Sequence, residues 1–183
     1  MSVLASNALI FQQTTNVSRN DFAILDAESQ QQVAHVETGG STLGRMFTGA
    51  RELYVYDGPG NPLIHVSDTM TFGRDRLMVY EADGSTLAAV VKQLTFFKMH
   101  ITIDLGGEEL ELVGNFRGLD FQIVAPYGEL ASVTRQWSGF ANSMFGKSTY
   151  LLQLHPGLDD TRRKAVIGSV LALDLLRAKA DRG

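Results

Sequence analysis

The sequence predicts a mainly β fold: a closed antiparallel barrel of about twelve strands that encloses a hydrophobic α-helix close to the C-terminus. Two observations lead to this prediction. Pairs of alternating apolar and polar segments, separated by turn residues, fill most of the chain. After them, residues 165–176 form a helix-like run whose large apolar residues fall on every side. A helix that is apolar all round must be surrounded by protein or by lipid.

The apolar run at 165–176 is too short to cross a bilayer. It has about 12 residues and contains the carboxylate of Asp174, whereas a spanning helix needs about 20 apolar residues. Asp159 or Asp160 is a suitable N-cap, and the helix is expected to continue to about Arg177. The basic residues 162–164 fall in the first turn, where they oppose the helix dipole, and nothing in the local sequence explains them.

The alternating segments predict five successive hairpins. Period-2 alternation bounded by Gly, Asp and Asn is typical of antiparallel strands joined by tight turns. The hairpins cover residues 22–36, 53–66, 77–91, 100–114 and 121–134, with further strands at 8–14 and 150–154. A series of this length must protect its edges, and closure into a barrel does so. Because a barrel of about twelve strands is too wide for side chains alone to fill, the apolar helix is predicted to occupy its interior.

Length and composition indicate one soluble domain over residues 1–183, with a core from about 8 to 177. The formal net charge of −4 argues against a nucleic-acid-binding protein. Residues 1–91 hold 5 of the 16 Lys and Arg residues and 10 of the 20 carboxylates, so an anionic partner should meet the second half of the chain. The absence of cysteine excludes disulfides, thiolate-bound zinc and S-palmitoylation. Without a signal-peptide pattern, a cytoplasmic location is expected.

No arrangement of reactive residues points to an enzyme. The histidines show no metal-binding spacing, no nucleophile elbow occurs, and Asp26, Asp57 and Asp83 are interpreted as turn formers. Residues 146–148 look like the end of a phosphate-binding loop, but the earlier glycine is missing and a strand follows where a helix is required. Trp137 is interpreted as a core residue or an anchor at the barrel rim, with insertion into a membrane as the alternative. No cofactor or metal is expected. The four histidines are His35, His65, His100 and His155.

Four stretches of the chain match motifs of one known group of proteins. Residues 132–139 follow a "G-x-I-x-K-x-W-x-G" strand, and residues 150–160 follow an "F-G-x-x-F-P-x-D-L-D" segment. Residues 164–174 match a "K-A-V…G-A-x-F-L-I-D" helix, and residues 45–57 match an upstream "R-x-x-x-G…F-x-x-x-x-x-D" stretch. In these motifs the chain resembles the phospholipid scramblase-related and LURP-one-related proteins of the tubby-like superfamily. The resemblance implies a barrel around a central helix.

The resemblance also implies a non-enzymatic function in which the domain associates with phospholipid or phosphoinositide headgroups, or with a membrane-bound partner. Where the family's proposed calcium site places carboxylates, residues 146–149 have none, so calcium binding is not expected. A peripheral membrane association without a transmembrane segment is expected. The alternative is a soluble interaction or scaffold domain without affinity for lipid.

Five basic residues of the second half are the candidate ligand-binding residues. They fall at predicted strand ends or turns, and phosphate recognition needs several convergent Lys or Arg donors. The alternative is that they are scattered, solvated surface charges. Asp174 is expected to be a structural residue paired with Arg135 or with a backbone donor. The five candidates are Lys92, Lys98, Arg117, Arg135 and Lys147.

Overall fold

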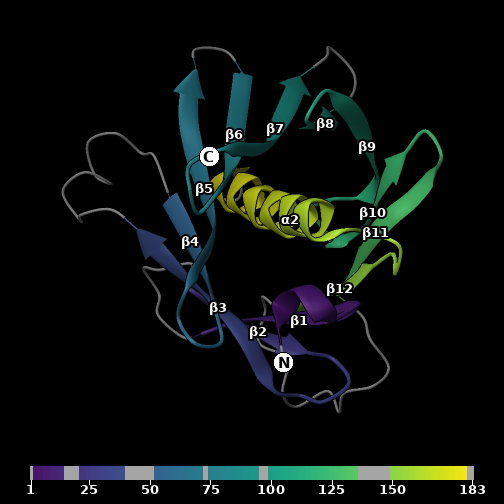
Figure 1. The fold of residues 1–183 in the computed structure, drawn as a ribbon. Coiled ribbons are helices and arrows are strands. Elements are labelled where there is room, and N and C mark those ends of the chain that lie inside the picture. Colours follow the sequence, from purple (N-terminus) through teal and green to yellow (C-terminus); the bar gives the residue numbers. More distant parts are fainter. Residues whose placement is uncertain are drawn as a thin grey trace.

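The fold is a closed β-barrel threaded by one helix (Figure 1). The structure is a computed structural model that describes residues 2–14, 21–39, 52–71, 74–94, 99–135 and 149–180. The elements are the 3-10 helix η1 (Val3–Ala5), the strands β1 (Ala8–Gln13), β2 (Phe22–Asp26), β3 (Gln32–Gly39), β4 (Glu52–Asp57), β5 (Pro62–Thr71), β6 (Arg74–Glu81), β7 (Thr86–Leu94), β8 (Met99–Leu105), β9 (Glu108–Asn115), β10 (Asp120–Ala125), β11 (Gly128–Thr134) and β12 (Thr149–Leu154), and the helix α2 (Asp160–Ala180). The predicted fold class is confirmed, and α2 extends three residues beyond the expected end at Arg177.

Every strand pairs antiparallel with its neighbours in sequence, and the first strand pairs with the last. In this closing pair Leu9 lies opposite Leu152, and Phe11 lies opposite Tyr150. The closure leaves no strand edge within the barrel wall, as the sequence argument required. Along strands such as β2, β4 and β10 the buried side chains alternate with more exposed ones, and the buried set points toward α2. On β1 and β12 consecutive residues are buried, and Ile10 and Leu151 form a second, smaller cluster with Ala27. Every residue from 165 to 176 is buried, and Leu171 has 0% exposure.

The helix packs mainly against one wall of the barrel, made by β5, β6 and β7. Gly168 makes this approach possible, because a Cβ at that position would lie 3.2 Å from Ile64 Cγ2 and still closer to Val79 Cγ1. Large rings provide the bulk on the opposite wall: Phe11 and Tyr150 stack at 5.0 Å between centroids, and Phe22 meets Tyr150 edge-on at 6.3 Å. Gly168 toward one wall and the large rings on the other therefore fix the position of the helix, which lies close to β5, β6 and β7 (Figure 1).

Replacing Gly168 by alanine is expected to destabilise the fold by about 1–2 kcal/mol. Two effects compete: alanine favours a helix over glycine by about 1 kcal/mol, while overpacking a well-packed core costs about 1–3 kcal/mol. The steric conflict with Val79 makes the net change in the free energy of unfolding unfavourable. Adding Val79→Ala to Gly168→Ala should recover part of the loss in urea unfolding. A gain of about 1 kcal/mol for Gly168→Ala alone would show that propensity decides instead, and that the close approach is absent.

The turn-forming interpretation of Asp26, Asp57 and Asp83 is confirmed. The carboxylate of Asp57 accepts from Asn61, and that of Asp83 accepts from Ser85, which lowers the pKa of both groups. Asp26 does more than close a turn, because it is 4% exposed and also accepts from the hydroxyl of Ser6. That hydroxyl is the main cause of its lowered pKa, with further help from Ser29. Asp26 thus ties the start of the chain to the β2–β3 turn.

Candidate functional site

The barrel has two ends, which we name by the course of α2. The odd-numbered strands run from the helix-entry end, where α2 begins, to the helix-exit end, where it finishes. The turns at 27–31, 58–61, 82–85, 106–107 and 126–127 lie at the helix-entry end. The described β9–β10 turn, residues 116–119, lies at the helix-exit end.

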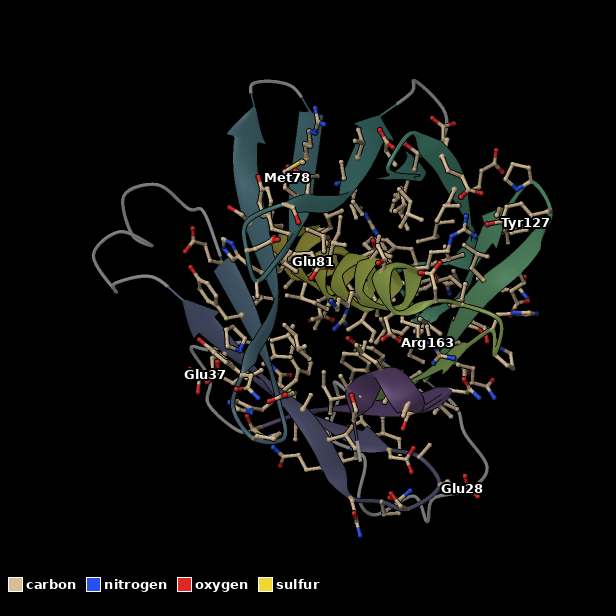
Figure 2. All side chains as sticks on the ribbon, in the orientation of Figure 1. Glu28, Glu37, Met78, Glu81, Tyr127 and Arg163 are labelled. Atoms are coloured by element: carbon tan, nitrogen blue, oxygen red, sulfur yellow. The ribbon has the colours of Figure 1, made fainter. Side chains whose placement is uncertain are left out.

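Arg163 anchors the beginning of α2 inside the helix-entry end (Figure 2). It is 6% exposed, and its guanidinium donates to carbonyl oxygens of Leu158, Ser6 and Pro156 at 3.0, 2.8 and 3.3 Å. A fourth acceptor is the side-chain oxygen of Asn7 at 2.6 Å. One buried side chain therefore joins the helix, the preceding loop and the start of the chain.

The neighbouring basic residues bind the rim around the same end. Arg162 donates to a carboxylate oxygen of Glu108 at 3.1 Å and contacts the hydroxyl of Tyr127. Lys164 Nζ lies 2.8 Å from a carboxylate oxygen of Glu81. These partners explain the basic first turn of α2, for which the local sequence gave no reason. The basic residues oppose the helix dipole, but they attach α2 to three turns of the barrel.

At the helix-exit end, ionised groups face into the barrel around the last turn of α2. Lys92 Nζ lies 3.5 Å from Asp75 on the adjacent strand, and Lys179 Nζ lies 3.7 Å from the same carboxylate. Lys179 also pairs at 2.5 Å with Asp68, whose side chain is 1% exposed. Lys92 is itself only 14% exposed, because it follows the buried Val90 by two positions and points inward with it. Its charge is therefore matched within the barrel mouth.

A second interior pair lies deeper, where Arg177 donates to a carboxylate oxygen of Asp174 at 2.8 Å. The expected partner of Asp174 was Arg135 or a backbone donor; the structure supplies a residue of α2 itself, three positions later. The hydroxyl of Tyr150 is buried nearby, without a hydrogen-bond partner among the described residues. Burial and then the negative charge of Asp174 raise the pKa of Tyr150 well above its usual value, while Arg177 opposes the shift.

Three of the five candidate ligand-binding residues lie at the helix-exit end. Lys92 faces inward, whereas Arg117 and Arg135 are exposed. The latter two lie at neighbouring strand ends, because Asp120 pairs with Asn115 on one side and with Thr134 on the other. Lys98 and Lys147 lie outside the described residues. The sequence reasoning missed Arg177 and Lys179, although both follow the apolar run within the helix and its last turn emerges beside the strand ends.

The other sequence candidates take structural positions where they are described. His35 stacks on Tyr56 and His65 on Tyr54, and His155 Nδ1 accepts from Gly157 N at 3.1 Å. The described residues contain no group of three or more potential metal ligands. Among the described helices, none combines the length and the hydropathy that crossing a bilayer requires. Trp137, the side chain of His100 and the phosphate-loop-like residues 146–148 lie outside what the structure describes.

Comparison with known proteins identifies the family. The family model for LURP-one-related proteins matches residues 7–174, which include the complete barrel and most of α2. The chain belongs to the LURP-one-related family. Among solved structures, this LURP-one-related chain is similar to a protein from Arabidopsis thaliana, with 12% identity, 93% of each chain covered and a TM-score of 0.54. At that identity the likeness concerns the fold. No curated protein matches the chain.

Proposed function

We propose that this LURP-one-related protein is a non-enzymatic, peripheral cytoplasmic domain that binds anionic phospholipid headgroups at its helix-exit end. The observation that supports the proposal is the separation of charge between the two ends of the barrel. A protein with a formal net charge of −4 is repelled by an anionic membrane as a whole. Binding therefore needs one region where cations outnumber carboxylates.

The helix-entry end is acidic. Each of its turns brings at least one carboxylate or is flanked by one, and the basic side chains described there are the three at 162–164, which hold α2 to the rim. This end would be the last to approach an anionic surface. Its carboxylates are Asp26, Glu28, Asp57, Glu81, Asp83, Asp104, Glu108, Glu109, Glu129, Asp159 and Asp160.

The helix-exit end has the opposite tendency. Its inward-facing acids are matched by the basic residues of β7 and α2, and Arg117 and Arg135 are exposed in addition. The other carboxylates of the described strand ends there are fewer than at the helix-entry end: Asp21, Glu37, Glu52 and Asp120. The sequence segments that join strands finishing at this end contain no Asp or Glu at all. These segments are residues 15–20, 40–51, 72–73, 95–98 and 136–148, and their basic residues are Arg19, Arg45, Arg51, Lys98 and Lys147.

Sedimentation with liposomes tests the proposal. Protein should bind vesicles that contain phosphatidylserine or a phosphoinositide at low salt, and ignore vesicles of phosphatidylcholine. Each basic residue near an anionic surface contributes about 1 kcal/mol. Replacing Lys98, Arg117, Arg135 and Lys147 together by alanine should therefore weaken binding by roughly a hundredfold or more. Lys92 is left in place because it faces inward and matches Asp75.

The matched control is Glu28→Lys, which raises the net charge at the exposed β2–β3 turn of the helix-entry end. If binding is local to the helix-exit end, this variant should bind like wild type. Equal binding by wild type and the quadruple variant would contradict the proposal, as would wild-type protein that stays in the supernatant with anionic vesicles. In the second case the function is that of an interaction domain without lipid affinity.

A further inference from the structure

The outer face of β3–β6 carries two neighbouring sets of stacked rings, which together we name the tyrosine face: His35, Tyr54, Tyr56, His65 and Tyr80. These side chains alternate with buried ones and so point away from α2. The ring of His65 lies between two tyrosines from the adjacent strands, 4.4 Å from Tyr54 and 5.7 Å from Tyr80 between centroids. On the neighbouring row His35 stacks on Tyr56 at 5.2 Å.

Strand pairing alone accounts for part of this arrangement. Directly opposed aromatic residues stabilise adjacent strands, and the ring of Tyr54 covers Gly39, where a Cβ would have no room. The rings remain half-buried although no element of the described fold covers them. Tyrosine is also the residue type that is most characteristic of binding surfaces, together with tryptophan and arginine.

A surface pocket of about 320 Å³ opens beside the tyrosine face, between Thr14 and β2–β3. Its lining includes Asp21, His35, Glu37 and Thr38. His35 Nε2 lies 3.6 Å from a carboxylate oxygen of Glu37, and the side chain of Asp21 accepts from Thr38 N at 2.8 Å. The volume is at the low end of the range of about 300–1,000 Å³ for ligand pockets, so it suits one long side chain rather than a cofactor.

Among the described residues that line the pocket, Asp21 and Glu37 are acidic and none is Lys or Arg. The strands β2, β3, β4 and β5 contain no Lys or Arg in their sequence. Glu37 is 62% exposed at the pocket, and Glu52 is 40% exposed beside Tyr54, whose hydroxyl donates to it at 3.0 Å. Because this wall of the barrel is closed, a partner cannot add a strand to an edge and must be recognised by side chains.

We infer that the tyrosine face and its pocket bind a basic peptide segment of a partner protein, with an Arg or Lys side chain inserted between Asp21 and Glu37. The adjoining tyrosine rings hold the remainder of the segment. A charged donor in the pocket meets carboxylate acceptors, and the stem of an Arg or Lys side chain packs on aromatic rings. Part of this pocket lies beside the strand ends at the helix-exit end, but the inference rests on the carboxylates of Asp21 and Glu37 and on the tyrosine rings, so it does not depend on lipid binding.

The test uses the peptide acetyl-Ala-Arg-Ala-Arg-Ala-amide, with the glutamine-substituted peptide and acetyl-arginine amide as comparison probes. Backbone amide shifts in NMR titrations should concentrate at His35, Glu37, Tyr54 and Tyr56. The arginine peptide should bind more tightly than either comparison probe, because it alone presents both the charge and the length. Glu37→Lys should weaken its binding by about tenfold or more, because like charges then oppose each other in the interface.

Two further variants make the result specific. Glu28→Lys changes the net charge equally at the exposed turn of the β2–β3 hairpin, at the opposite end of β3 from Glu37, and should change the affinity by no more than about twofold, because it alters only the general field. Tyr56→Thr keeps a residue suited to a strand and should weaken binding by about fivefold or more, as loss of an interface tyrosine does. Circular dichroism checks that both variants are folded.

Three outcomes would overturn the inference. The first is a set of shifts spread over the acidic turns of the helix-entry end, and the second is equal weakening by Glu28→Lys and Glu37→Lys. The third is acetyl-arginine amide that binds as tightly as the peptide, because the tyrosine face would then add nothing. The peptide titration contains no vesicles, and Tyr56→Thr changes no charge, so a failure here is distinguishable from a failure in the liposome experiment.

Discussion

Replacing Leu171 by aspartate is expected to leave little soluble, folded protein. Leu171 has 0% exposure at the centre of α2, which is enclosed by the barrel. An unpaired charge buried there costs several kcal/mol, and single domains are stable by only about 5–15 kcal/mol. Leu171→Ala, which removes bulk without adding a charge, should cost about 2–5 kcal/mol and leave a folded protein. Soluble yield and thermal unfolding measure both effects.

Val113→Asp is the matched control for the aspartate variant. Val113 is on β9 and is 49% exposed, so the same new charge reaches water there. The free energy of unfolding of this variant should lie within about 0.5 kcal/mol of the wild-type value, apart from a small loss of strand propensity. If Leu171→Asp also melts close to wild type, the helix lies outside the barrel and the architecture is wrong.

Removing the side chain of Arg163 is expected to lower the free energy of unfolding by about 3–4 kcal/mol. Its guanidinium satisfies four acceptors, two of them in fully buried hydrogen bonds, on the start of the chain and on the loop before α2. A buried acceptor left without a donor costs about 1–3 kcal/mol, and water entering the space can replace some of the lost bonds. Arg163→Lys should lie between alanine and wild type, because an ammonium keeps the charge but lacks the planar fork.

The adjacent Arg162 forms a surface ion pair and is therefore the comparison for the buried Arg163. Its side chain is 36% exposed and pairs with Glu108, so Arg162→Ala should cost no more than about 1 kcal/mol. Urea unfolding of Arg162→Ala and Arg163→Ala under the same conditions gives the comparison. Equal losses for the two variants would show that Arg163 contributes as a surface charge rather than through its buried contacts.

The fold could be predicted from sequence because two local patterns constrain each other. The period-2 alternation requires a closed sheet, and the all-apolar run at 165–176 requires an enclosure. The reason for the basic residues at 162–164 could not be predicted, because their partners outside the loop before α2 lie between 35 and 157 residues away in the chain. No local rule of helix formation connects Arg163 with Ser6.

The candidate site was predictable only in part. The inward direction of Lys92 can be read from the sequence, because Lys92 occupies the same alternating positions of its strand as the buried Ala88 and Val90. Its choice as a candidate rested only on its positive charge. The positions of Arg117 and Arg135 at strand ends follow from turn residues and agree with the structure. The two histidines at corresponding hairpin positions gave no sign of function, because their meaning depends on tyrosines placed opposite them by strand register.

The pairing of β1 with β12 has a consequence for how the protein is made. The first strand leaves the ribosome early, but its closing partner and the helix that fills the barrel are encoded last. Until they emerge, the nascent chain exposes an apolar sheet face with two open edges, a state prone to aggregation. The many contacts between distant residues also make folding slow relative to helical proteins of similar size. Protection of the nascent chain by chaperones therefore matters most until β12 and α2 have emerged.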